Sequence, residues 1–144
     1  MKFDFSFQKV LEFKEKEKEV VQQEFGEIKH KQLKLEEQID GLEKTKEAVF
    51  NQYNDVNRKT VWEILEVQEE IKHINLRMEK LSYQQREITQ EVEQKQKVLI
   101  EKTQEAKMWN QWKEKSKFAF QKQLDQKEQA LLDEMAVLRY SRNG

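Results

Sequence analysis

The sequence predicts an all-α fold in which two long helices form an antiparallel coiled-coil hairpin, with the second helix longer than the first and overhanging it. Three observations lead to this prediction. The 144 residues contain no proline and only three glycines, so little interrupts a helix. Charged residues make up 38% of the chain and hydrophobic residues 36%, which is too polar for a broad core. Apolar residues recur at spacings of three and four, which is typical of helices that bury a narrow seam. We treat residues 1–144 as one hairpin domain.

The first helix is expected over about residues 4–55, because one seam of mostly apolar positions runs through this range. Two series of positions, each with a spacing of seven residues, make up this seam. They are Phe7, Lys14, Val21, Ile28, Leu35, Leu42, Val49 and Val56, and Leu11, Lys18, Phe25, Gln32, Ile39, Lys46 and Tyr53.

A turn over about residues 56–60 is expected next, because the repeat gains one residue between Val56 and Ile64. Asparagine and aspartate residues gather at positions 51, 54, 55 and 57, and their side chains compete with helical hydrogen bonds. Thr60 and Glu63 have the spacing of a capping box, in which each side chain accepts a hydrogen bond from the other residue's amide. A helix should therefore begin near residue 61.

The second helix is expected over about residues 61–140, and it carries a second seam. Its two series are Ile64, Ile71, Met78, Gln85, Val92, Leu99 and Ala106, and Val67, Ile74, Leu81, Ile88, Lys95, Lys102 and Trp109. A short connection favours antiparallel neighbours, and pairing Val56 with Ile64 makes the numbers of facing residues add up to about 120.

This register leaves the end of the second helix without a partner after about residue 115. The overhang keeps an apolar stripe of its own, formed by Leu124, Glu128, Leu131, Met135 and Leu138. An isolated helix is marginally stable in water, so a helix with such a stripe is expected to bind a partner.

Composition argues against several classes of function. The chain has no cysteine, no glycine-rich phosphate loop and no HExxH motif, and His30 and His73 fall at outward positions of different helices, so we expect no enzyme, no metal and no cofactor. Lys and Arg total 27 against 28 Asp and Glu, which gives no basic face for nucleic acid. No apolar run approaches the roughly 20 residues that span a bilayer, so no direct membrane insertion is expected.

Two groups of hydrophobic residues are candidates for protein binding. Seven aromatic residues should gather at the open end of the hairpin, where they either plug the frayed end of the coiled coil or form a docking surface. They are Phe3, Phe5, Phe7, Trp109, Trp112, Phe118 and Phe120. Near the turn, Phe50, Trp62 and Leu65 fall off the seam, so they either face a partner or are covered by the loop.

Three stretches resemble the family of the flagellar export protein FliJ. They are F-x-F-x-F-Q-K-V-L-E-F-K-E-K-E from Phe3 to Glu17, V-x-E-x-x-x-V-Q-x-x-I from Val61 to Ile71, and a late W-K-E-K-S-K from Trp112 to Lys117, ahead of Asp133 and Glu134. One departure is Glu70 before Ile71, where relatives often carry an aromatic residue.

The resemblance implies a non-enzymatic component of the bacterial flagellar type III export apparatus, with a fold similar to the central stalk subunit of rotary ATP synthases. Such proteins insert the terminal end of the hairpin into the hexameric ring of the export ATPase FliI and promote its assembly and activity. They also contact the export gate protein FlhA and export chaperones. The implied location is cytoplasmic, at the cytoplasmic face of the cell membrane, and the free chain is expected to be a monomer.

The resemblance also implies two sets of contact residues. The ATPase contact would involve Phe3, Phe7, Gln8, Leu11, Trp109, Trp112, Lys115, Phe118, Leu124, Leu131 and Leu138. The gate contact would involve Trp62, Leu65, Ile71, Ile74 and Leu81. Two alternatives remain open at this point: a general export chaperone, and a homodimeric scaffold in which one uninterrupted helix pairs with a second chain.

Overall fold

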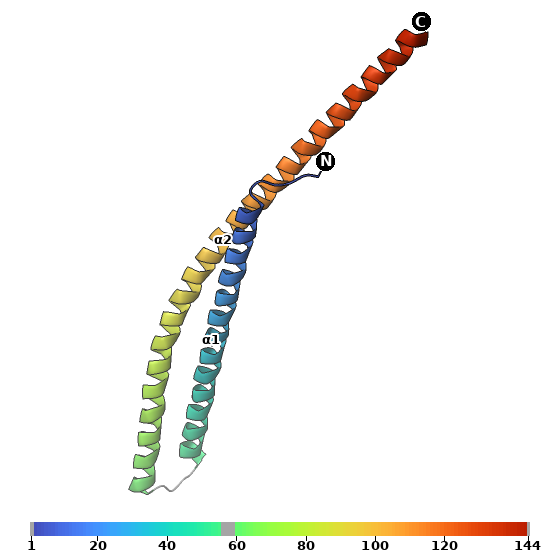
Figure 1. Ribbon diagram of the computed structural model, residues 1–144. Helices are drawn as coiled ribbons and strands as arrows, with labels where there is room; N and C mark the ends of the chain where they lie inside the picture. The colour runs from blue at the N-terminus through green and yellow to red at the C-terminus, as the bar shows by residue number, and fades with distance from the viewer. Residues whose placement is uncertain (1, 56–59, 144) are drawn as a thin grey trace. The chain divides into compact units, whose positions relative to one another are not determined.

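The computed structural model describes residues 2–55 and 60–143, which form two long α-helices (Figure 1). Helix α1 spans Gln8–Asp55 and helix α2 spans Val61–Asn143, with 48 and 83 residues. The two helices run side by side in opposite directions, which confirms the predicted all-α hairpin with a longer second helix. A single uninterrupted helix is excluded, because α1 and α2 of one chain contact each other, as in the ion pair of Lys95 and Glu24.

The chain divides into two compact units, Val21–Leu99 and Met1–Val20 with Ile100–Gly144. In the first of these units the core is the predicted seam. Leu35, Val49, Ile74 and Val92 are buried, and the other described seam positions are half-buried, apart from Tyr53. Nζ of Lys95 lies 2.8 Å from a carboxylate oxygen of Glu24, and these residue numbers add up to 119. The predicted register is therefore confirmed in this unit.

The unit that contains both ends of the chain has a seam with the same register. Leu11 and Ala106 are buried with exposed fractions of 4% and 1%. Lys14 pairs with Glu105 at 3.1 Å, and Lys102 pairs with Glu17 at 3.3 Å, so both pairs again have residue numbers that add up to 119.

The start of the first helix differs from the prediction. Helix α1 begins at Gln8, not at about residue 4, and the described residues before it are not helical. The amide of Gln8 donates to the carbonyl oxygen of Phe5 at 3.1 Å, and the amide of Leu11 donates to that of Phe7 at 3.0 Å. The physical reason lies in the alternation of Phe3, Phe5 and Phe7, because a spacing of two suits an extended chain and not a helical face.

This non-helical segment also moves the end of the paired region. An extended chain advances about 3.3 Å per residue against 1.5 Å in a helix, so it covers more of its partner than a helical segment of equal length. Figure 1 shows the segment beside α2, and the ring of Phe3 contacts that of Phe120 with centroids 5.5 Å apart. Helix α2 therefore has a neighbour as far as residue 120, five residues beyond the predicted limit.

The beginning of α2 agrees with the predicted cap. The amide of Glu63 donates to Oγ1 of Thr60 at 3.3 Å, which is the first hydrogen bond of the expected capping box. Helix α2 ends at Asn143, three residues beyond the predicted end. The predicted turn, apart from Thr60, and the predicted pairing of Val56 with Ile64 lie outside the described residues.

Candidate protein-binding surfaces

Six of the seven predicted aromatic residues come together at the ends of the chain. We call this group the aromatic cluster, and it consists of Phe3, Phe5, Phe7, Trp109, Trp112 and Phe120. The Phe7 ring stacks on Trp112 with centroids 5.0 Å apart, and Phe5 meets Trp112 edge-on at 6.3 Å. The two tryptophan rings lie 5.2 Å apart. Phe118 lies outside the cluster and is 72% exposed.

The aromatic cluster is partly buried and partly open to solvent. Phe5 is 7% exposed and closes the end of the seam, whereas Phe7 and Trp112 are 42% and 47% exposed. Met108, Gln111 and Lys115 line a shallow groove with the two tryptophans. The cluster therefore closes the coiled coil and also presents aromatic surface next to a lysine, a composition that is common at protein interfaces.

Next to the cluster, the seam is ionic and not apolar. Oε2 of Glu17 is enclosed, and it lies 3.3 Å from Nζ of Lys102 and 3.7 Å from Nζ of Lys14. Glu105 lies 3.1 Å from Lys14 and 3.6 Å from Lys102. The seam lysines thus bury their aliphatic stems and turn their ammonium groups to carboxylates, as expected for lysine at an apolar interface.

These contacts shift the pKa values of three groups. The hydrogen bond from Lys14 lowers the pKa of Glu105 below its usual 4.5. The hydrogen bond from Asn110, with help from Lys18, lowers the pKa of Glu15. The hydrogen bond with Glu17 raises the pKa of Lys102 above its usual 10.5. All three shifts favour the charged form in the folded chain.

The shifted pKa values predict a stability plateau between mildly acidic and mildly alkaline pH. The contribution of Glu15 and Glu105 is present above pH 4.5, their unfolded value, and is lost as pH falls through their lower folded pKa values. The contribution of Lys102 is present below pH 10.5 and is lost as pH rises through its higher folded pKa. Thermal unfolding followed by circular dichroism should show both limbs, and Glu105→Gln should flatten the acidic one. An acidic limb unchanged by that substitution would contradict the assignment.

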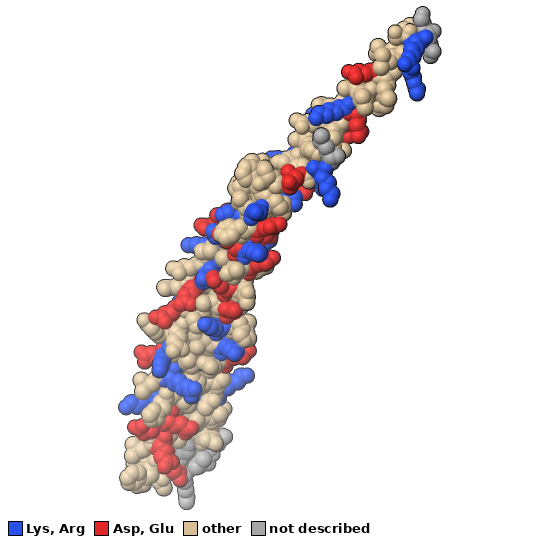
Figure 2. Space-filling model, in the orientation of Figure 1, with Lys and Arg blue, Asp and Glu red and all other residues tan. Residues whose placement is uncertain are grey.

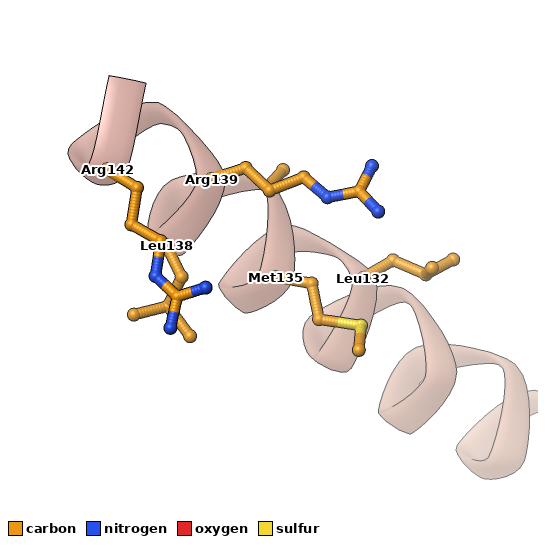
Figure 3. A pocket seen from close by; sticks show the side chains of 6 residues that line it. Leu132, Met135, Leu138, Arg139 and Arg142 are labelled. Carbon is orange, nitrogen blue, oxygen red and sulfur yellow. The ribbon is translucent and has the colours of Figure 1, made fainter. Parts of the chain in front are cut away.

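Helix α2 beyond Leu124 is the second candidate surface, and we call residues 125–142 the overhang. Every side chain in this range is exposed, including Leu131, Met135 and Leu138 at 58%, 55% and 64%. Figure 3 shows the side chain of Arg142 extending alongside Leu138. The predicted stripe is therefore present, and among the described residues no other segment covers it.

The predicted ATPase-contact residues differ in accessibility. Leu11 lies buried in the seam, and Gln8, Trp109 and Leu124 are half-buried. The remaining members are Phe3, which is half-buried under Phe120, and the exposed residues Phe7, Trp112, Lys115, Phe118, Leu131 and Leu138. All of them belong to the unit that holds both chain ends.

The third candidate surface lies on the outward side of α2 near its start. Trp62 and Leu65, which the sequence indicated, are 78% and 48% exposed. Leu76 and Tyr83, which sequence reasoning missed, are 56% and 62% exposed. Trp62, Leu76 and Tyr83 are separated by multiples of seven residues and therefore lie along one line of the helix, opposite the seam. We call these four residues the outer stripe.

The other predicted gate residues lie in the seam. Ile74 is 8% exposed, and Ile71 and Leu81 are half-buried where α2 packs on α1. Phe50, from the end of α1, is 44% exposed, as expected for a position off the seam. The signal that could have identified Leu76 and Tyr83 is their shared heptad position with Trp62.

Positive and negative side chains are mixed along both helices. Lys and Arg alternate with Asp and Glu over the face shown in Figure 2. Among the described residues, no group of three or more His, Asp or Glu side chains could hold a metal ion. None of the described helix has both the length and the apolar character needed to cross a membrane.

Comparison with known proteins places the chain in a family. Residues 2–144 match the family described as flagellar FliJ protein. Searches among curated proteins and among solved structures returned no match. Because the family match covers essentially the whole chain, the protein belongs to the flagellar FliJ family, whose members are non-enzymatic components of the flagellar export apparatus.

Proposed function

We propose that the chain is the stalk of the flagellar export apparatus, and that its terminal end enters the hexameric ring of the export ATPase FliI and promotes ring assembly and activity. The observation that carries this proposal is the combination of the aromatic cluster and the bare overhang in one compact unit. Exposed Phe7 and Trp112 offer rigid aromatic anchors, and the overhang offers a helix that a ring interior can enclose.

The physical role of the hairpin would be mechanical coupling without chemistry. A helix whose backbone hydrogen bonds are satisfied internally can present side chains to a ring without a folded domain around it. The overhang carries Lys127, Arg139 and Arg142 among its leucines, so a ring lined with apolar and acidic side chains would complement it.

We further propose that the outer stripe contacts the export gate protein FlhA and that the same chain handles export chaperones. Trp62, Leu65, Leu76 and Tyr83 are exposed, whereas Ile71, Ile74 and Leu81 are occupied by packing on α1. The predicted gate contact would then rest on the outward residues. This arrangement would hold the chain at the cytoplasmic face of the cell membrane without insertion.

The proposal is tested by ATPase stimulation. The double variant Phe7→Ala with Trp112→Ala should abolish stimulation of purified FliI, because it removes the two exposed rings of the aromatic cluster. Phe13→Ala is the matched control, since Phe13 is 58% exposed on α1 and is not part of the cluster. Circular dichroism should show the same helix content in all variants.

Two results would count against this assignment. Stimulation by the double variant equal to that of the unmodified chain would show that the ring does not use the aromatic cluster. Equal loss of stimulation with Phe13→Ala would show that the effect is not specific to the terminal surface.

A further inference from the structure

The apolar stripe that runs from Leu124 into the overhang has the heptad spacing of a helix in a coiled coil. Leu124, Leu131 and Leu138 are seven residues apart, and Met135 lies between the last two at spacings of four and three. A general apolar binding face does not require this repeat, whereas a partner helix does. The three stripe residues within the overhang are more than half exposed, so this part of the helix has no neighbour among the described residues.

Charged residues of both signs lie beside this stripe, including Lys127 near its beginning and Glu134 near its centre. Asp125 and Glu128 lie near its beginning, and Arg139 and Arg142 lie near its end. A parallel pair of two such helices would set Glu128 against Glu128 and Arg142 against Arg142 of the other copy at the seam. An antiparallel pair would instead set Glu128 and Arg142 against leucines of the other copy and place Arg139 beside Asp125, which favours that arrangement.

We propose that the overhangs of two copies of this chain pair with each other in antiparallel orientation. Leu131 of each copy then packs against Met135 of the other, and Arg139 lies beside Asp125 of the other copy. Leu124 is level with Arg142 of the second copy. The pairing therefore uses only the part of α2 that the N-terminal segment, which reaches Phe120, leaves uncovered.

The pair should be weak, so that the chain is a monomer when dilute. Each helix offers fewer than three heptads, and Glu128 and Arg142 stand at seam positions. Glu134 of each copy would also lie near Glu134 of the other copy, which opposes the pairing. The consequence rests on the proposed function: the pair covers the surface that we assign to the ATPase, so pairing and ring binding should compete.

Distance measurements between spin labels test the orientation. The chain has no cysteine, so Glu134→Cys and Lys127→Cys each give one labelled site. These two positions are seven residues apart and occupy the same side of the helix. In the antiparallel pair, labels at 134 should be close, and labels at 127 should be separated by about 20 Å along the helix axis at 1.5 Å per residue. Equal short distances at both sites would indicate a parallel pair, and the absence of any intermolecular distance would overturn the proposal.

Sedimentation equilibrium of variants with exchanged charges tests the contact between Arg139 and Asp125. Arg139→Asp should weaken the dimer about tenfold, because two symmetric ion pairs become repulsive. Arg139→Asp combined with Asp125→Arg should restore the dimer, whereas the control Lys122→Asp, outside the overhang, should leave it unchanged. Failure of the exchange to restore the dimer would overturn the assigned register.

The same samples separate this proposal from the proposed function. A chain that stimulates FliI but stays monomeric at every concentration would overturn only the pairing. The overhang would then bind the ATPase ring and not a second copy. A chain that pairs as described but never stimulates FliI would overturn only the proposed role as a stalk. In the case that we expect, added FliI dissociates the pair and the label distances at position 134 disappear.

Discussion

Leu35→Ala is expected to lower the free energy of unfolding by about 2–3 kcal/mol, near the lower end of the range for leucine truncation in a core. Leu35 is 7% exposed and lies in the seam of the unit Val21–Leu99. A hairpin of two helices has no second layer that could close around the missing side chain. Leucine and alanine have similar helix propensities, so the loss reports packing between the helices.

Leu33→Ala is the matched control for this prediction. Leu33 lies two residues away on the same helix and is 56% exposed, so its truncation should change the free energy of unfolding by less than about 0.5 kcal/mol. Urea unfolding followed by circular dichroism measures both variants. Similar effects of the two substitutions would show that α1 and α2 do not pack along this seam.

The pairing of the helices could be predicted because the heptad repeat is a direct consequence of that pairing. Positions such as Leu35 and Val92 are apolar since they face the other helix, and the register follows from a short connection. The ion pairs of Lys14, Lys95 and Lys102 agree with the same register, because it brings each of these ammonium groups close to a carboxylate of the other helix.

The beginning of the chain could not be predicted from the repeat. Phe7 continues the heptad series of α1, so the helix was expected to extend through it towards residue 4. The alternative, an extended segment with alternating phenylalanines, uses the same residues and gains its stability from rings on α2. Only the position of Trp112 and Phe120 relative to this segment decides between the two, and that is a tertiary contact.

The candidate gate surface could also be predicted only in part from the sequence. Trp62 was recognised because it falls off the seam, but Leu76 and Tyr83 stand in stretches where isolated exposed hydrophobic residues are common. Their alignment with Trp62 indicates a common outward surface only when the opposite side of α2 is known to pack on α1. Ile74 illustrates the converse, because an apolar residue at the start of α2 can serve the seam alone.

If the outer stripe contacts FlhA as proposed, Trp62→Ala is expected to weaken binding of the purified cytoplasmic part of FlhA about 30-fold, the size of effect known for aromatic anchor residues of interfaces. Trp62 is 78% exposed, so the free energy of unfolding should change little. Ile74→Ala is expected to do the opposite: it should lower the free energy of unfolding by about 2 kcal/mol, because Ile74 is 8% exposed in the seam. Binding of FlhA by the folded Ile74→Ala chain should remain unchanged.

Isothermal titration calorimetry at a temperature where both variants are folded measures the binding, and thermal unfolding measures the stability. The two variants form a crossed pair, since each is the control for the other. If Ile74→Ala weakened FlhA binding at full helix content while Trp62→Ala did not, the gate would contact the seam, and the hairpin would have to open for it. The burial of Ile74 in the seam is the reason why the proposed gate contact is assigned to the outward side of α2.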